Sequence, residues 1–319
     1  MAKQRDVKRR IKSVKNTSKI THTMELVATA KAKLCTNRIQ RAIPYFVALA
    51  EIAGEARKGG GASGPAAEGP SRDEESAALH PLLEERPVKK VTIFAVAANR
   101  GLCGGYNGNV LRLAKRRREE LLAEGKEVTL LGVGRKLANG FKFQQIPFEG
   151  VKSPMPDDRP PYVECEKLAD DLARRFVDGL ADRVEIVYTH YYSAGRQAPR
   201  VETFLPISSQ PEETEEGEAK DKAAPPATAK KGKSVEFLIE PDPRTILDAI
   251  FPLQAKLHVY RVFLEAAASE QIARRIAMKN ATDNAEEVGK ALRMQYNRVR
   301  QASITKEILE IVGGSEALA

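Results

Sequence analysis

Residues Lys279–Leu318, KNATDNAEEVGKALRMQYNRVRQASITKEILEIVGGSEAL, decide the fold of this chain. Apolar residues recur along this segment, starting one residue before it, with the alternating spacing of three and four that makes one narrow stripe on a helix. They are Met278, Ala281, Ala285, Val288, Leu292, Val299, Ala302 and Leu309. Such a stripe predicts packing against a single partner helix. The polar side chains between its members are more numerous than one solvated face needs, which predicts a surface contacted by another protein.

The N-terminal residues carry a second stripe of the same kind. Stepping four and then three residues from Val7, only Glu25 is charged. The positions are Val7, Ile11, Val14, Ser18, Thr21, Glu25, Ala28, Ala32, Cys35, Ile39, Ala42, Phe46, Leu49 and Ala53. Two such helices from opposite ends of a chain can pack as an antiparallel coiled coil, with the residues between them folded as an inserted domain. The helices would be roughly 80 Å and roughly 100 Å long.

Composition excludes several classes of protein. The chain has 319 residues, 42% of them hydrophobic, so it is long enough to bury a core. No apolar run approaches the roughly 20 residues of a membrane span, and MAKQRDVKRR at the start lacks the apolar part of a signal peptide. Three separated cysteines, Cys35, Cys103 and Cys165, support neither a disulfide framework nor a zinc site. We therefore expect a cytosolic protein in a reducing compartment.

The net charge of +9 is concentrated at one end of the chain. Residues 1–58 hold fourteen Lys or Arg and four Asp or Glu, so the remainder is close to neutral. A basic helix can meet nucleic acid, anionic lipid or an acidic protein surface. We favour a protein surface, because the helix has a matched partner helix and because residues 1–44 contain no aromatic side chain that could stack on bases.

The middle of the chain alternates between strand and helix patterns. Expected strands are Val91–Ala97, Glu127–Val133 and Val184–Tyr192, and expected helices are Asn109–Leu122, Arg135–Asn139 closed by Gly140, and Tyr162–Gly179. This alternation predicts a mainly parallel sheet, so the fold class is α/β, a long antiparallel coiled coil with an inserted Rossmann-like α/β domain. Asp242 and Pro243 indicate the start of the C-terminal helix.

Five segments follow from these patterns. They are an N-terminal coiled-coil helix (1–58), a flexible insertion (59–87), the central α/β domain (88–208), a low-complexity insertion (209–234) and a C-terminal coiled-coil helix (235–319). The two insertions are rich in Gly, Pro, Ala and charged residues and have no sustained period.

Catalytic motifs are not evident. The Gly-rich turn at residues 100–108 follows a strand and precedes a helix, but its glycines do not have the spacing of a dinucleotide loop and no Gly-Lys-Ser/Thr follows. We interpret Gly101, Gly104 and Gly105 as a structural turn. The Gly132–Lys136 segment also lacks the required third glycine. Cys103 is interpreted as a buried side chain rather than a nucleophile, and the four histidines have no metal-ligand spacing. We expect no catalytic site, no cofactor, no metal and no direct nucleotide binding.

Several segments nevertheless resemble one family. They are IKSVKNTSKITHTMELVATAKAKL (11–34), NRGLCGGYNGN (99–109), IEPDPRTIL (239–247), SEQIARRIAMKNATDNAEE (269–287) and YNRVRQASITKEILEIVGG (296–314). Together they resemble the gamma subunit of the F-type proton-translocating ATP synthase, its rotating central stalk. The resemblance implies that the coiled coil lies within three alpha and three beta subunits, while the central domain faces the membrane c-ring and the epsilon subunit. It also implies coupling of proton flow to ATP synthesis or hydrolysis in the beta subunits, without a catalytic site in this chain.

The resemblance further implies which residues contact the beta subunits: Met24, Arg274, Arg300, Gln301 and Thr305. The family usually has Asp before the Arg of the Gly-rich turn, where this chain has Asn99. Neither insertion contains the cysteine pair of the chloroplast redox insert, so thiol switching is not expected. We hypothesise that Glu212–Glu218 contacts epsilon or the foot of the rotor. No transit peptide precedes the family's start, so we expect a peripheral protein on the cytoplasmic face of the bacterial inner membrane.

Two other functions compete with this one. A basic coiled-coil scaffold or nucleic-acid-binding protein would use the N-terminal helix, and its binding would weaken steeply with salt. A nucleotide-dependent enzyme would use the α/β domain, against which the missing phosphate motif counts.

Overall fold

The computed structural model describes residues 2–60, 80–150, 158–207 and 243–316. Most of the predicted insertion 59–87, all of 209–234 and the Glu212–Glu218 hypothesis therefore lie outside the described residues. The chain divides into two compact units. We call Met1–Ala30, Leu102–Gly104 and Ala273–Ala319 the terminal-helix unit, and Lys31–Gly101 with Gly105–Ile272 the sheet unit. The division into five segments stays a prediction.

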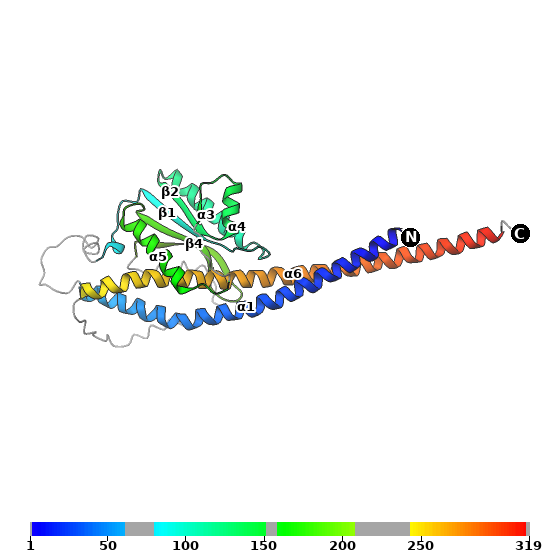
Figure 1. The fold of residues 1–319 in the computed structure, drawn as a ribbon, viewed down its shortest axis with the longest axis horizontal. Coiled ribbons are helices and arrows are strands. Elements are labelled where there is room, and N and C mark those ends of the chain that lie inside the picture. The colour runs from blue at the N-terminus through cyan, green and yellow to red at the C-terminus, as the bar shows by residue number, and fades with distance from the viewer. Residues whose placement is uncertain (1, 61–79, 151–157, 208–242, 317–319) are drawn as a thin grey trace. The chain divides into compact units, whose positions relative to one another are not determined.

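Two long helices, one at each end of the chain, contribute to both units (Figure 1). Helix α1 is Ala2–Gly60 and helix α6 is Pro243–Glu316. The predicted mixed α/β class with long N- and C-terminal helices is confirmed. Pro243 begins α6 as predicted, since proline fits the first helical turn, whereas Asp242 lies outside the described residues.

The sheet unit contains a five-stranded sheet in the order β3-β2-β1-β4-β5. Its strands are β1 (Lys90–Val96), β2 (Glu127–Val133), β3 (Glu149–Gly150), β4 (Arg183–Tyr191) and β5 (Gln197–Leu205). The β1, β2 and β4 strands match the three predicted ones and, with β3, are parallel to one another. Strand β5 is antiparallel to β4 and was not predicted, so the sheet is mixed.

Apolar layers cover both faces of this sheet. On one face, α3 (Tyr106–Ala123) and α4 (Arg135–Phe143) bury side chains such as Val110 and Phe141 against β1 and β2. On the other face, α5 (Tyr162–Val177) and the first part of α6 bury Phe176, Phe251 and Phe263 against β1, β4 and β5. The helices on the two faces can be followed in Figure 1. The predicted β-α alternation therefore gives a three-layer unit.

One predicted helix boundary is wrong. Gly140 was expected to close a short helix, but it lies inside α4, which continues to Phe143. A Cβ atom at this position would come within 2.9 Å of Leu111 Cδ2 on α3. Gly140 is therefore explained by the close approach of two helices rather than by a helix end. Helix α3 also begins earlier than predicted, at Tyr106.

The two glycines of β2 and its following turn are explained by close backbone contacts. A Cβ at Gly132 would lie 2.3 Å from the carbonyl oxygen of Ala95, and one at Gly134 would lie 2.3 Å from that of Ala97. Gly134 also has a φ of 117°, which favours glycine. These contacts account for a glycine pair that resembled part of a phosphate-binding loop.

We predict that Gly132→Ala destabilises the chain, because the added methyl group overlaps backbone atoms of β1. Overpacking of this kind costs roughly 1–3 kcal/mol or more. Thermal or denaturant unfolding of the free chain measures the change. Gly108→Ala is the control, because no atom lies within 4 Å of its added Cβ; equal stability of the two variants would contradict the prediction.

Candidate partner interface on the paired helices

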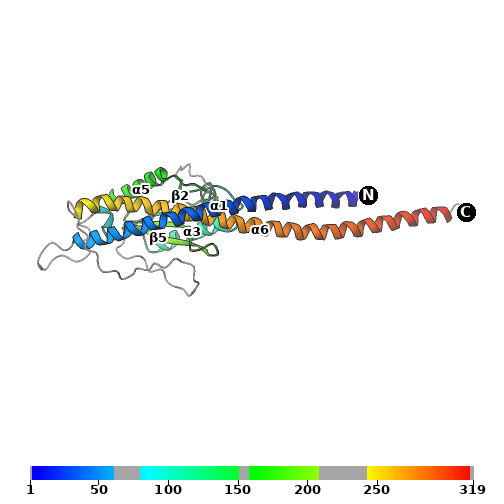
Figure 2. The same ribbon diagram turned by 90° about the horizontal axis from the view of Figure 1, so that it is seen from below.

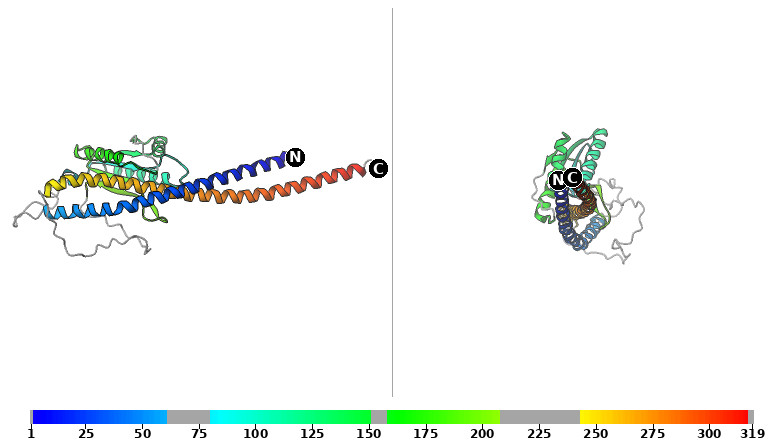
Figure 3. Two further views of the ribbon diagram at one scale, coloured as in Figure 1. Left: turned by 60° about the horizontal axis from the view of Figure 1, so that its bottom comes forward. Right: turned by 90° about the vertical axis from the view of Figure 1, so that its right-hand side faces the viewer.

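In the terminal-helix unit, α1 and α6 pack side by side in opposite directions (Figures 2 and 3). The hydroxyl oxygens of Thr21 and Thr282 lie 2.8 Å apart and are hydrogen-bonded. Val14, seven residues before Thr21 on α1, lies next to Gly289, seven residues after Thr282 on α6. Near the start of α1, the side-chain amide of Gln4 donates to the hydroxyl of Tyr296 over 3.4 Å. These contacts establish the predicted antiparallel arrangement and its heptad step.

The stripe predicted on α1 is confirmed along its whole length. All fourteen positions from Val7 to Ala53 are buried or half-buried, and the residues between them are mostly exposed. In the sheet unit the same stripe packs against α6, where Cys35 and Ile39 form a cluster with Leu264, Ala267 and Ala268. Burial raises the pKa of the Cys35 thiol to about 11, so this cysteine behaves as a packed apolar side chain.

The stripe predicted on α6 is partly wrong. Val288, Ala302 and Leu309 are exposed, and the buried or half-buried positions, apart from the predicted Ala281, follow a strict four-three alternation instead. These positions are Met278, Thr282, Ala285, Gly289, Leu292, Tyr296, Val299 and Ser303. Half of them are polar or lack a side chain, so a search for apolar residues selected neighbours on the wrong side of the helix.

Gly289 gives a test of this packing. Its added Cβ would lie 3.8 Å from Val14 Cγ1, which is an ordinary van der Waals contact. We predict that Gly289→Ala raises the free energy of unfolding by about 0.5–1 kcal/mol, because glycine is costly inside a helix. Gly289→Leu should lower it by roughly 1–3 kcal/mol, because the larger side chain separates the helices. Denaturant unfolding of the free chain measures both, and a stabilising Gly289→Leu would contradict the pairing.

Beyond Ser303, α6 extends past the start of α1 and loses its partner (Figure 2). The exposed fractions there are 46% for Ile304, 55% for Ile308, 66% for Leu309 and 72% for Ile311. We call these four residues the apolar tip. The sequence analysis placed Leu309 in the helix seam and missed the tip. The tip is predictable from the sequence, because α1 starts near Ala2 and cannot cover the last turns of a longer antiparallel helix.

All five predicted contact residues lie in the terminal-helix unit. Arg300, Gln301 and Thr305 are exposed and follow Tyr296, close to the apolar tip. Met24 and Arg274 are half-buried and lie on the other side of the Thr21–Thr282 contact, toward the rest of the helix pair. Exposed apolar residues also lie near these two along the helices: Ile20, Leu26 and Val27 on α1 and Ile276 on α6. The contact residues therefore form two groups on the pair rather than one.

The Gly-rich turn is held by asparagine side chains. Asn107 accepts a hydrogen bond from the backbone of Ala98 and donates to the carbonyl of Arg100. Asn99 accepts from the backbone N–H of Arg135 over 3.2 Å, which satisfies a free donor at the start of α4. Among the three glycines assigned to the turn, only Gly104 has a positive φ, 58°. The purely structural role of the turn stays a prediction.

Comparison with known proteins identifies the family. A family model described as ATP synthase matches residues 3–318. An ATP synthase gamma chain from Leptospira biflexa is 42% identical over the full length of both chains, and one from Moorella thermoacetica is 38% identical, also over both full lengths. The chain belongs to the ATP synthase gamma chain family. The rotor of the Euglena gracilis mitochondrial ATP synthase has the same fold, with TM-scores of 0.62 and 0.57 in two rotational states at 20% and 18% identity. The first match covers 99% of this chain and 95% of the solved chain. The second covers 95% of this chain and 99% of the solved chain.

Within residues 2–60, 80–150, 158–207 and 243–316, no helix is long and apolar enough to cross a bilayer. In that same part of the chain, no three His, Cys, Asp or Glu side chains come together as metal ligands. Cys103 is buried, as is Cys165, whose pKa is raised to about 12 by burial.

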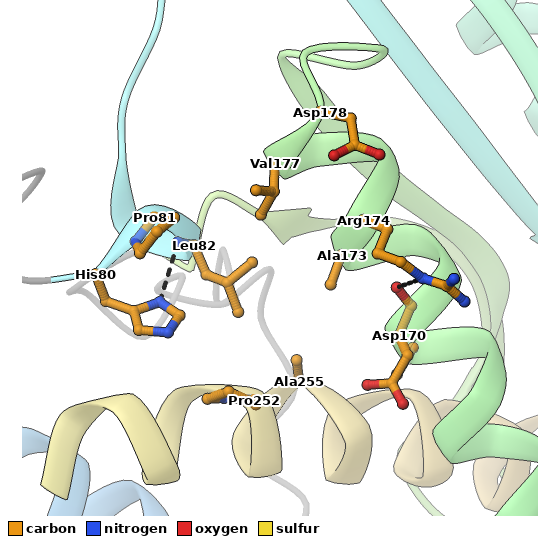
Figure 4. Close-up of a pocket in the computed structure, with 11 residues that line it drawn as sticks. His80, Pro81, Leu82, Asp170, Ala173, Arg174, Val177, Asp178, Pro252 and Ala255 are labelled. Atoms are coloured by element: carbon orange, nitrogen blue, oxygen red, sulfur yellow. Dashed lines mark hydrogen bonds between the residues drawn. The ribbon is translucent and has the colours of Figure 1, made fainter. Parts of the chain in front are cut away.

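A cavity of about 560 Å³ lies between the short helix η1 (Pro81–Leu83), α5 and α6 (Figure 4). Its walls are mostly apolar, and Asp170 and Asp178 are among the residues that line it. Arg174 donates to the carbonyl of Asp170 and is ion-paired with Asp171. Carboxylates repel phosphate groups, so this cavity does not favour the nucleotide-dependent enzyme.

A polar cluster lies between the β4–β5 hairpin and α6 in the sheet unit. It consists of Tyr188, His190, Glu202, His258, Arg261 and Glu265. Burial alone would raise the pKa of Glu202. Hydrogen bonds and charge from His258 and Arg261, with the hydroxyl of Tyr188, outweigh that effect and hold the pKa well below its ordinary value of 4.5. Sequence analysis missed this cluster, because no local pattern connects residues on two strands and a distant helix.

We predict that Glu202 makes the chain acid-sensitive. A carboxyl whose pKa is lowered by folding stabilises the folded state above its unfolded pKa and loses that effect as the pH falls. At pH 7, Glu202→Gln should lower the free energy of unfolding by about 3–5 kcal/mol, because Arg261 and His258 lose a buried partner. The difference should shrink as the pH falls below 4.5. Unfolding curves across pH test this, with exposed Glu127→Gln as the control; a constant difference would contradict it.

Proposed function

We propose that this chain is the rotating central stalk of an F-type ATP synthase, coupling proton flow through a membrane c-ring to ATP synthesis or hydrolysis. The main observation behind this proposal is the antiparallel α1–α6 pair, whose longer helix ends in an exposed apolar tip. The family of the chain and its full-length match to gamma chains support the same function. The relevant solved structures are described as the rotor and the F1 and c-ring assembly of an ATP synthase.

The paired helices would lie within a ring of three alpha and three beta subunits. Their outer surface is not symmetric, because only α6 ends in the apolar tip and most of the net positive charge lies on α1. As the pair turns, each beta subunit would face different side chains and shift between conformations of different nucleotide affinity. Met24, Arg274, Arg300, Gln301 and Thr305 are the proposed beta-subunit contacts.

Catalysis would then occur in the beta subunits, and this chain would be an essential subunit without a catalytic site of its own. The sheet unit would face the c-ring and the epsilon subunit. The complex would place this chain on the cytoplasmic face of the bacterial inner membrane as a peripheral protein. Support comes from bacterial gamma chains that match over the whole length.

Purification of the tagged chain from its own membranes tests this function. We predict recovery of alpha, beta, epsilon and c subunits in a fixed ratio, and loss of ATP-driven proton pumping when this chain is omitted from reconstitution. The apolar tip should be required, because its burial removes apolar surface from water. Ile308→Asp combined with Leu309→Asp should reduce assembly with alpha and beta subunits.

The neighbouring substitution Glu307→Gln is the control for the tip, because Glu307 is exposed and its hydrogen bond with Ser303 is a surface contact. It should leave assembly unchanged. Recovery of the chain without alpha and beta subunits, together with salt-sensitive binding to duplex DNA, would overturn the function in favour of the nucleic-acid-binding alternative.

A further inference from the structure

The polar cluster joins the sheet to the C-terminal helix at one place. His258, Arg261 and Glu265 are spaced by three and four residues, so they share one face of α6. Tyr188 and His190 alternate along β4 and therefore share the face of the sheet that meets this helix. Glu202 comes from β5, whose register with β4 places it opposite Ile186, next to Tyr188. Three elements thus direct their polar side chains to a common region.

The contacts within the cluster form a connected network. The hydroxyl of Tyr188 donates to Glu202 Oε2 over 2.7 Å and lies 3.0 Å from His190 Nδ1. Glu202 Oε1 accepts from Arg261 over 2.7 Å and lies 3.2 Å from His258 Nε2. On the other side, Glu265 Oε2 lies 2.5 Å from His190 Nδ1, and Arg261 Nε lies 3.7 Å from Glu265 Oε1. Each of the two strands is therefore bonded to α6 by charged groups.

The tyrosine sets the direction of these bonds. Tyr188 has one hydroxyl proton, and at 2.7 Å that proton goes to Glu202. Its oxygen is then the acceptor toward His190, so the hydrogen of that contact is carried by His190 Nδ1. Burial and the adjacent carboxylates raise the pKa of Tyr188, which keeps this proton in place. Within the described residues, His258 Nε2, Arg261 Nε and Glu265 Oε2 are held in this network by charge contacts and have no hydrogen-bond partner.

Around this network, α6 and the sheet also bury apolar side chains together, such as Val259, Val262 and Phe263. Apolar burial depends on the area removed from water and is not directional. Hydrogen bonds and ion pairs lose strength steeply when distance and angle change. A displacement of the sheet along the helix axis is therefore opposed more strongly by the oriented contacts of the polar cluster than by the apolar contacts around it.

We propose that the polar cluster fixes the β4–β5 hairpin to α6 against displacement along the helix, so that torque applied to the sheet unit reaches the C-terminal helix. These are positioning residues, since the role proposed for them is to hold the hairpin and the helix together. The proposal rests on the proposed function, and it adds where in the chain the load passes from the sheet to the helix.

Replacing the part of the network around Glu202 by apolar residues separates rigidity from stability. We choose Tyr188→Phe, Glu202→Leu, His258→Leu and Arg261→Met together, which leaves the His190–Glu265 pair in place. Exchange of a buried ion network for packed apolar side chains is often neutral or stabilising. This variant should therefore fold and assemble, yet lack the directional contacts around Glu202. The single variant Glu202→Gln tests the same contact with the smallest change of shape.

The readout is ATP-driven proton pumping in vesicles, measured per ATP hydrolysed, with and without an opposing proton gradient. We expect the apolar variant to hydrolyse ATP as the wild type does without a gradient and to lose pumping as the gradient rises. A merely structural defect would instead lower the amount of assembled complex and leave pumping per complex unchanged. Arg261→Lys, which keeps the charge, should restore part of the pumping that Arg261→Met removes.

Lys256→Met is the matched control on the same helix. Lys256 joins α6 to α5 through Glu166 at 2.8 Å and Asp170 at 3.5 Å, and these carboxylates are substantially exposed. Such a surface ion pair contributes little, so pumping should not change. Normal pumping under load by an assembled apolar variant would overturn the proposal. If that variant does not assemble, normal pumping by assembled Glu202→Gln complexes would overturn it. Failure of the wild-type chain to join alpha and beta subunits would instead refute the proposed function.

Discussion

The narrow antiparallel contact between α1 and α6 is the constraint on which the rest of this structure depends. It uses small side chains, such as Ala28 on α1 and Gly289 on α6, so the helices approach closely. A narrow contact leaves most of each helix surface exposed. The same constraint that joins the two ends of the chain therefore provides the surface that other subunits can contact. It also requires the central residues to fold as an insertion between the two helices.

Polar groups within this contact have a different role from apolar ones. The Thr21–Thr282 hydrogen bond adds little net stability, because both hydroxyls would otherwise bond to water. A shift of the helices by one residue would nevertheless separate these hydroxyls and move Val14 away from Gly289. Polar residues in a coiled-coil seam specify register in this way. A stalk that carries torque needs a fixed register more than it needs a few additional apolar contacts.

Structural features that follow from a local sequence period were predicted, whereas features that depend on contacts between distant residues were missed. The α1 stripe was correct at every position because the period was followed through Ser18, Thr21 and Glu25 regardless of polarity. On α6 only apolar residues were chosen, and Val288 was therefore assigned to the seam although it is exposed. Strand β5 was missed because its run is interrupted by polar residues and a proline. The proposed beta-subunit contacts rest on the family resemblance, which no periodicity could replace.

Rotation imposes opposite demands on the two kinds of surface. The apolar tip would contact its surroundings through burial that has no preferred direction, so it could turn without breaking oriented bonds. Inside the sheet unit, the contacts of Glu202 with Tyr188 and Arg261 are oriented, and rotation of the whole chain leaves them intact. Directional bonds are suited to places where parts must not move relative to each other. Non-directional contacts are suited to places where parts must move relative to each other. In this chain the two kinds of contact occupy different parts of α6.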